Sequence, residues 1–382
     1  MIIGACDACL RRALLIERLA PRIERVASGR GGRGSPELLA LEDDRLASAV
    51  GGRRADDSLT DARAASARDL RRRVDAARCW TTCRHHAAYP VTLLDLGDEA
   101  PAALFGRGEW AALAGLDPTT TATIVGARRA SAYGLGVAEE LGRMLAGAGI
   151  VVVSGLANGV DSRAHRGALD GDGVTIAVLG GGADVPYPRR QVGLYRRIVS
   201  SGGVVVSELP PGAASFRWCF PARNRIMAAL GKITVVVEAA ERSGSLITAG
   251  MALDLGRSVG AVPGQVNSWM STGTNQLLVD GAVPVRDAQD VLDHLLGAGS
   301  PNVREPGPEL DPQLRSILEH VEAGHVTCDG VAMASSAPAH VTATALTRLE
   351  LLGYLTSGHT GRYSRTPMVA PETADAGLPS GA

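Results

Sequence analysis

Six short runs of apolar residues, separated by longer amphipathic stretches, constrain the fold of this chain more than any other feature. The runs lie between residues 121 and 264 and read TATIVG, GIVVVSG, VTIAVLG, GVVVSE, KITVVVEA and RSVGAVPG. Strands with apolar residues at consecutive positions are buried on both faces, which is typical of a parallel sheet covered by helices. The alternation predicts an α/β fold with an extended Rossmann-like, doubly wound and mainly parallel sheet.

The sequence on either side of this sheet predicts further parts. Residues 1–115, rich in Ala and Arg, predict a helical N-terminal region, and residues 116–298 form the Rossmann-like domain. A stretch with Pro, Gly and Asn at 299–311 predicts a linker, because such residues mark domain boundaries. Helical patterns and a glycine-tipped hairpin at 312–368 predict a winged-helix-like domain, and 369–382 is expected to be a disordered tail.

The charges of the chain are nearly balanced, with 39 basic and 40 acidic residues. A polyanion would therefore have to meet a local basic patch, because the whole molecule has no large net field. The first apolar run is too short for a signal peptide, and no run reaches the roughly 18 apolar residues of a membrane span. We expect a cytoplasmic protein without a membrane partner, and six cysteines in so long a chain do not predict a disulfide scaffold.

Each of the six predicted strands ends in a polar or Gly-rich turn. The turns read GARRASAYG, SGLANGVDSRAH, GGGADVPYP, SELPPG, EAAERSGSLITAG and PGQVNS. In a doubly wound sheet the carboxyl ends of the strands meet the N-termini of helices, whose free N–H groups favour anions. The turns together predict a ligand site along this edge of the sheet.

The segment FRWCFPARNR, residues 216–225, follows the fourth predicted strand and concentrates arginine and aromatic residues. Seven arginines but one acidic residue, Glu208, lie between Arg189 and Arg225. Arg223 and Arg225 follow a proline at the expected start of a helix, where ligand contact is favoured. Phe216 and Trp218, at alternate positions, are expected to be buried.

Two further turns offer donors for an anion. In SGSLITAG the candidates are Ser243, Gly244 and Ser245 at a helix start, although the same residues could be a plain helix cap. SGLANGVD could likewise hold a phosphate, and its Asp161 is expected to fix the loop. His165, four residues further on, is expected to make a structural hydrogen bond rather than to act as a base.

Common catalytic motifs are missing from the sequence. The first turn has two arginines instead of GxGxxG, and the second strand ends in Ser154 instead of an acidic residue that would bind ribose. There is no GxSxG elbow, and no pair of carboxylates for a catalytic metal is evident at the strand ends. The sequence does not support a nicotinamide enzyme or a hydrolase.

Several motifs together resemble the central domain of the DNA-processing protein A family, also called DprA or Smf. They are IVGARRASAYG, SGLANGVDSRAH, VLGGGADVPYP, SELPPG, FPARNRIMAAL, VVEAAERSGSLITAGMALDLGRSVGAVPG and GTNQLLVDGA. The resemblance runs from about Tyr89 to about Leu296, over half of the chain. The later segments LTRLELLGYL and GRYSR resemble the winged-helix domain of the family.

The resemblance implies a protein that is not an enzyme and has no cofactor. It implies that the chain binds and protects single-stranded DNA, forms a homodimer, and loads the RecA recombinase during natural transformation. The strand contacts it implies are Arg128, the loop with Ser154, Gly155, Ala157, Asn158, Gly159 and Asp161, and the segment with Arg217, Phe220, Arg223, Asn224 and Arg225. A basic groove for phosphates and an aromatic ring for base stacking are what a single strand requires.

The N-terminal region departs from the sterile-alpha or helix-hairpin-helix domain with which this family often begins, and we interpret it as a degenerate version. It has two cysteine pairs, Cys6 with Cys9 and Cys79 with Cys83, and His85 and His86 lie close by in the sequence. The pairs could form a tetrahedral structural zinc site if the fold brings them together, or they could be free cysteines.

An alternative on the same kind of sheet is a nucleotide-binding enzyme resembling the phosphoribohydrolases of the LOG type. Their PGGxGTxxE turn is absent, and VPGQVNS and ERSGSLITAG do not supply the glutamate. The C-terminal module contains Glu319, Glu322, Asp329 and Glu350, which favours a protein contact or a regulatory role over duplex DNA binding.

Overall fold

The computed structural model describes residues 4–29, 35–51, 60, 66–297, 307–357, 361–366 and 368. It divides the chain into two compact units, residues 1–300 and residues 301–382, and the division falls in the predicted linker. The predicted disordered tail lies outside the described residues. Each unit is described by itself below.

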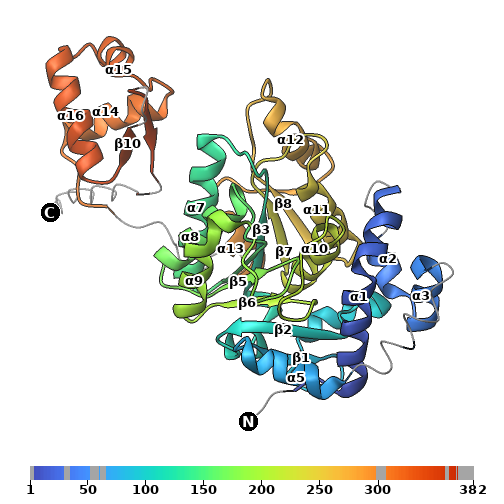
Figure 1. Cartoon of the computed structure of the whole chain (residues 1–382). Coiled ribbons are helices and arrows are strands. Elements are labelled where there is room, and N and C mark those ends of the chain that lie inside the picture. Colours follow the sequence, from blue (N-terminus) through green and yellow to red (C-terminus); the bar gives the residue numbers. More distant parts are fainter. Residues whose placement is uncertain are drawn as a thin grey trace, which may run out of the picture. The chain divides into compact units, whose positions relative to one another are not determined.

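Unit 1 is built on a single sheet (Figure 1). In the described part of the chain this sheet has nine strands in the order β1-β2-β6-β5-β4-β3-β7-β8-β9. The strands from β6 to β9 are parallel, whereas β1 and β2 are antiparallel. Their bounds are β1 (Trp80–Cys83), β2 (Ala103–Gly108), β3 (Thr121–Val125), β4 (Val151–Ser154), β5 (Thr175–Val178), β6 (Val204–Ser207), β7 (Ile233–Val236), β8 (Ser258–Ala261) and β9 (Val283–Pro284).

All six predicted strands are present, as β3 to β8, and the predicted α/β class is confirmed. Every residue of β3, β5, β6 and β7 is buried, as continuous apolar runs predict. The sheet grows from β3 through β4, β5 and β6 in one direction and through β7, β8 and β9 in the other. The gap between β3 and β7 is therefore the topological switch point, where such sheets bind ligands.

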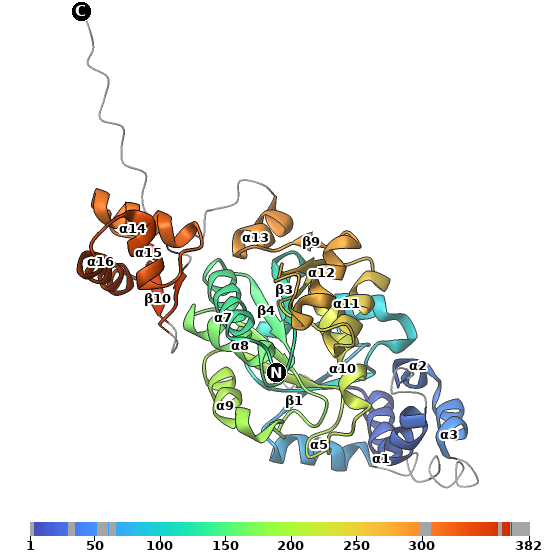
Figure 2. The same ribbon diagram turned by 90° about the horizontal axis from the view of Figure 1, so that it is seen from above.

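Helices cover both faces of this sheet, with α7, α8 and α9 on one face and α10 and α11 on the other (Figures 1 and 2). The helices are α1 (Asp7–Gly29), α2 (Ser35–Ala40), α3 (Asp43–Gly51), α5 (Ala67–Ala76), α6 (Ala111–Ala114), α7 (Ala132–Gly147), α8 (Val160–Asp170), α9 (Val192–Ser200), α10 (Cys219–Leu230), α11 (Gly244–Asp254), α12 (Thr272–Val279) and α13 (Ala288–Leu296). Short 3-10 helices are η2 (Val91–Glu99), η3 (Pro118–Thr120), η4 (Arg189–Gln191) and η5 (Trp269–Ser271).

The predicted boundary at residue 115 does not separate the N-terminal region from the sheet. Strands β1 and β2 both precede it and pair with each other, and β2 also pairs with β6. Their sequences, WTTC and ALFGRG, are short and lack the runs of Val and Ile that mark the other strands. The prediction of a helical region over 1–115 is therefore wrong for these two strands, because their sequences carry no such pattern.

Helix α1 packs against the start of α10 through Trp218. The Trp218 side chain is 2% exposed and lies in one apolar cluster with Leu19 and Ile23 of α1. Its indole N–H donates to the carbonyl of Ala20 at 3.1 Å, and its backbone N–H donates to the carboxylate of Glu24 at 3.1 Å. The prediction that Trp218 is buried is confirmed, and the half-buried Phe216 packs against the same cluster.

Unit 2 consists of three helices followed by an antiparallel hairpin, within the residues that the structure describes. Its elements are α14 (Pro312–Glu322), α15 (Cys328–Ser335), α16 (Ala339–Leu351), β10 (Leu355–Ser357) and β11 (Tyr363–Arg365). Leu314, Ile317, Leu346, Leu349 and Tyr354 are in its own apolar core. No helix among the described residues of either unit is both long and apolar enough to cross a membrane.

Candidate nucleic-acid interface

A pocket of about 930 Å³ lies at the switch point of the sheet, where the carboxyl ends of β3 and β7 meet. We call it the switch-point pocket. Its lining comes from the turns after β3, β4, β5, β6 and β7, from α10, from the start of α11 and from the far end of α1. The lining includes Arg128, Ala157, Asp161, Tyr187, Arg217, Phe220, Arg223, Asn224, Arg242, Ser243, Gly244 and Ser245. The structure therefore brings together most of the residues predicted to contact a ligand.

An arginine and two aromatic rings lie side by side in this pocket. The guanidinium of Arg128 lies over the ring of Phe220, 5.2 Å from its centroid. The ring of Tyr187 lies 5.5 Å from that of Phe220, tilted by 41°. Arg128 and Tyr187 are exposed, and Phe220 is half-buried. The arrangement offers a positive charge and a stacking surface at one place.

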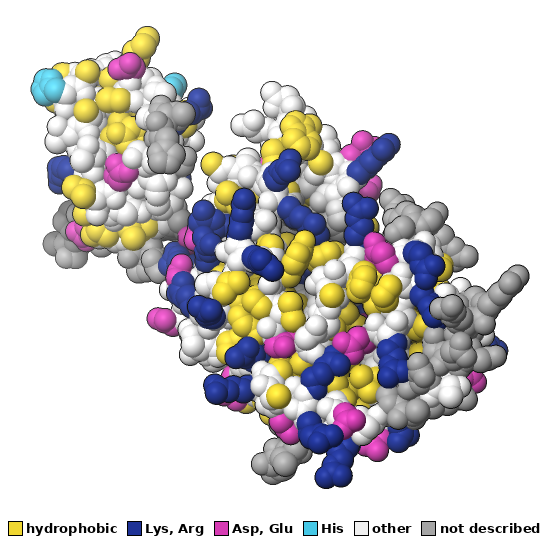
Figure 3. All heavy atoms as spheres, viewed as in Figure 1, with side chains coloured by type: hydrophobic (Ala, Val, Ile, Leu, Met, Phe, Trp, Pro, Cys, Tyr) yellow, Lys and Arg dark blue, Asp and Glu magenta, His cyan; other side chains and the backbone are white. Residues whose placement is uncertain are grey.

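Two more arginines add positive charge to the lining. Arg217 and Arg242 are both exposed, and Asn224 between them is half-buried. On the face of the molecule seen in Figure 3, Lys and Arg side chains gather across the upper central part of unit 1, next to apolar side chains. Tyr187 and Arg242 were not predicted as site residues, although both lie in turns that the sequence marks as strand exits.

The start of helix α11 also faces the pocket. Ser243 caps this helix, and its hydroxyl oxygen accepts from the backbone N–H of Ser245 at 3.4 Å and lies 2.8 Å from the Ser245 hydroxyl. Gly244 is exposed. The same residues thus serve as a helix cap and place N–H and O–H groups in the lining, where the helix dipole favours an anion.

Arg223 lies at the floor of the pocket and is 6% exposed. Its guanidinium donates to the carbonyl of Val178 at 2.5 Å and lies 3.7 Å from the carboxylate of Asp161. Burial lowers the pKa of Arg223 to about 10, so its guanidinium is still charged at neutral pH. Burial raises the pKa of Asp161, and the nearby charge of Arg223 opposes that rise. Arg223 is thus a fixed charge beneath the site.

Gly155 makes room for this arginine, which is a different role from the predicted phosphate contact. A Cβ at Gly155 would lie 1.8 Å from a terminal nitrogen of Arg223, so the guanidinium can cross the end of β4 only above a glycine. Asp161 fixes the same loop by accepting from the backbone N–H of Ala157 at 3.4 Å. The prediction that Asp161 fixes its loop is confirmed.

Ser154 and Arg225 do not reach the pocket, so the structure contradicts their prediction as DNA contacts. The Ser154 hydroxyl is fully buried and donates to the carbonyl of Ile124 at 2.6 Å. Arg225 is 1% exposed, and one of its terminal nitrogens donates to both oxygens of Glu208 at 2.8 Å. Its other donors bind the carbonyls of Glu99 and Ala222.

The remaining loop residues lie at the edge of the site. The Asn158 side chain accepts from the amide of Gln191 at 3.1 Å and is half-buried. Gly159 has φ 83° and comes just before α8, where a Cβ would lie 2.2 Å from the carbonyl oxygen of Ala127. Glycine is therefore required there by backbone geometry, independent of any ligand.

The start of helix α7, the usual phosphate position of a nucleotide-binding sheet, is occupied by a carboxylate of the protein itself. The carboxylate of Glu238 accepts from the backbone N–H of Ser131 at 2.7 Å and from its hydroxyl at 2.8 Å. Glu238 is 3% exposed, and a Cβ at Gly134 would collide with it. This internal anion disfavours a nucleotide phosphate at the first turn.

His165 is fully buried and its Nδ1 lies 2.7 Å from the hydroxyl of Thr175. Burial lowers the pKa of this imidazole to about 3, so it is neutral at physiological pH. The prediction of a structural hydrogen bond is confirmed.

The predicted zinc ligands are brought together only in part. Cys6, Cys9 and Cys83 form a group with His85 in which all ligand atoms lie within 4.8 Å of one another. The thiol of Cys79 is 3.7 Å from the carbonyl of Ala77 and is not in this group. Cys79 is therefore wrong as a predicted ligand, because it precedes β1, whereas Cys83 is the last residue of that strand and His85 follows it.

A doubly wound sheet with a basic, aromatic-lined pocket at its switch point defines a Rossmann-like ligand-binding protein. The chain belongs to the family described as DNA recombination-mediator protein A, whose model matches residues 80–296. Proteins of this family are DNA-binding mediators rather than enzymes, and the match disfavours the phosphoribohydrolase alternative.

Individual relatives agree with this assignment. The chain is 43% identical over 220 residues to the putative DNA processing protein DprA of Mycobacterium tuberculosis. The matched region covers 56% of this chain and 56% of the relative, so the chain spans little more than half of that relative's length. It is 35% identical over 311 residues to protein Smf of Escherichia coli, covering 75% of this chain and 79% of the relative.

Two solved structures are similar to the chain. DNA processing protein A from Streptococcus pneumoniae superposes with a TM-score of 0.58 at 31% identity, covering 75% of this chain and 95% of that one. The Helicobacter pylori protein, described as having a unique single-stranded DNA binding mode, gives a TM-score of 0.50 at 29% identity and covers 56% of this chain and 95% of that one.

Proposed function

We propose that this chain binds single-stranded DNA in the switch-point pocket without catalysing a reaction. The observation that carries the proposal is the stack of Arg128, Phe220 and Tyr187 inside a basic pocket. The H. pylori relative, whose description names single-stranded DNA binding, supports the same ligand.

The pocket residues divide between the two parts of a nucleotide. Arg128, Arg217 and Arg242 are exposed and contact phosphates, while Phe220 and Tyr187 stack on a base. Asn224 and the start of α11, from Ser243 to Ser245, add hydrogen-bond donors, and Arg223 below them contributes charge. Stacking tolerates any base, so the binding does not depend on sequence.

We further propose that the bound strand is protected and passed to the RecA recombinase during natural transformation, and that the chain acts as a homodimer. The family description as a recombination mediator supports the first role. Exposed apolar side chains on one short segment support the second: Val266 is 94%, Trp269 71% and Val279 81% exposed. We propose that these side chains form the contact between the two copies, since exposed apolar patches are typical of protein contacts.

For unit 2 we propose a winged-helix-like fold with a protein-binding or regulatory role. Its three helices and hairpin support the fold. The acidic side chains of Glu319, Glu322, Asp329 and Glu350 would repel duplex phosphates.

The proposal is tested with the purified chain and a fluorescent oligothymidine. We expect Phe220→Ala to weaken binding about 5- to 150-fold, because stacking contributes about 1–3 kcal/mol per base. Arg128→Ala should lower the slope of log affinity against log salt by about 0.7, the value for one phosphate of a single strand. Fluorescence anisotropy at several salt concentrations measures both.

Arg196→Ala is the matched control, since Arg196 is exposed on α9 and does not line the pocket. Binding that is unchanged in the Phe220→Ala, Arg128→Ala double variant would rule out this pocket as the DNA site. In the same preparations, RecA filament growth on DNA coated with a single-strand-binding protein should be accelerated by the wild type and the control but not by the double variant.

A further inference from the structure

We propose that Cys6, Cys9, Cys83 and His85 form a structural zinc site that ties helix α1 to the edge of the sheet. This site is inferred independently of the proposed DNA binding. It would take one divalent zinc ion, held by three thiolates and one imidazole, the donor set typical of closed structural sites.

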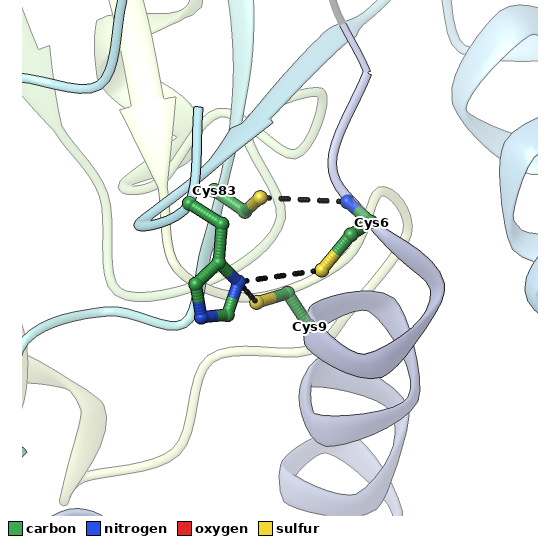
Figure 4. Close-up of side chains that lie close together, drawn as sticks. Cys6, Cys9 and Cys83 are labelled. Carbon is green, nitrogen blue, oxygen red and sulfur yellow. Dashed lines mark hydrogen bonds between the residues drawn. The ribbon is translucent and has the colours of Figure 1, made fainter. Parts of the chain in front are cut away.

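The distances between the donor atoms suit a tetrahedral ion. The Nδ1 atom of His85 lies 3.4 Å from the sulfur of Cys6 and 3.4 Å from that of Cys9. With Zn–S near 2.3 Å and Zn–N near 2.1 Å, a tetrahedron places such atoms about 3.6 Å apart. Figure 4 shows the sulfurs of Cys6, Cys9 and Cys83 turned toward one shared space.

The four ligands come from two short segments that are 77 residues apart in sequence. Cys6 immediately precedes α1, and Cys9 lies in its first turn. Cys83 ends strand β1, and His85 follows it in the next turn. The backbone N–H of Cys6 donates to the sulfur of Cys83 at 3.4 Å, and the N–H groups at the start of a helix favour negatively charged thiolates.

Burial of the group is uneven in a way that suits metal entry. Cys9 is 4% and Cys83 2% exposed, packed among Leu10, Leu70 and Phe105. Cys6 is half-buried and His85 is exposed, so the imidazole closes the site on the side facing solvent. Buried cysteines alone can be explained as apolar packing, but that does not explain an exposed imidazole directed at two of the thiols.

The site would also affect the DNA pocket through α1. The metal would hold the start of this helix, while Glu24 and Ala27 near its other end line the switch-point pocket. From Cys9 to Glu24 the helix rises roughly 23 Å, so the metal is a positioning element and not part of the pocket. Its loss would loosen that wall of the pocket.

The test is metal analysis of the full-length chain, purified under reducing conditions after expression with zinc. We expect about one zinc per chain by mass spectrometry of the metal, and close to none in the Cys6→Ser, Cys9→Ser double variant. Cobalt added to metal-free protein should give the visible absorption of tetrahedral cobalt and a thiolate charge-transfer band. Cys79→Ser is the matched control and should retain one zinc.

The double cysteine variant could lose zinc simply because it fails to fold. Substitutions of His85, which is exposed and therefore less important for packing, supply a second comparison. His85→Ala should weaken zinc binding, measured by competition with a chromogenic chelator, while His85→Cys should restore it by replacing nitrogen with sulfur. Removal of zinc from the wild type should lower its Tm, because an ion that binds only the folded state stabilises it. Wild-type protein that contains no zinc and gives no tetrahedral cobalt spectrum would overturn the proposal.

Discussion

Two arginines eight residues apart, Arg217 and Arg225, show how differently similar residues can act. Both lie in one basic and aromatic segment, and the sequence suggests the same role for both. Arg217 is exposed and lines the pocket, whereas Arg225 is buried with its donors taken by Glu208 and by the carbonyls of Glu99 and Ala222. Arg217 precedes α10, whereas Arg225 lies within this helix on its buried side.

This difference predicts opposite effects of substitution. Arg225→Met should lower the free energy of unfolding of unit 1 by about 3–5 kcal/mol, because it leaves the Glu208 carboxylate without its partner. Arg217→Ala should leave stability within about 0.5 kcal/mol and weaken DNA binding. Denaturant unfolding followed by tryptophan fluorescence measures unit 1 alone, since all four tryptophans are in it. An Arg225→Met protein that is as stable as the wild type but has lost DNA affinity would contradict the assignment of Arg225 to stability and Arg217 to DNA contact.

At the scale of elements, the order of the strands places the site. Turns that are far apart in the sequence, after β3, β4 and β7, become neighbours because β3 lies between β4 and β7. Sequence patterns predicted the strands and the turns, since both are local. They did not predict β1 and β2, because the sequences WTTC and ALFGRG contain no run of Val and Ile.

The segment from η5 to α12 carries the proposed dimer surface. Trp269→Asp and Val279→Asp should each weaken the dimer by about 30-fold or more, because a central apolar contact of an interface contributes about 2 kcal/mol or more. Sedimentation velocity over a range of concentrations measures the change. Leu351→Asp is the control, since Leu351 is 82% exposed but lies in unit 2. Wild-type protein that sediments as a monomer at all concentrations would refute the dimer.

At the scale of the molecule, the two units have separate apolar cores. Residues 1–300 alone should therefore fold and bind oligothymidine within about threefold of the full chain, because every residue of the switch-point pocket is in unit 1. Anisotropy titrations with single-stranded and duplex DNA measure this for the truncated and the full chain. A tenfold loss of single-strand affinity on truncation would assign unit 2 a share of the DNA site.

The sequence by itself determined the sheet class, its six central strands and the turns that hold the pocket, because apolar periodicity and turn residues act over a few positions. Only the tertiary structure decided that Arg225 is internal, that Tyr187 joins Phe220, and that Cys6 and Cys9 meet Cys83 and His85. Each of these depends on the packing of elements distant in the chain, above all of α1 against β1 and α10, which no local pattern encodes.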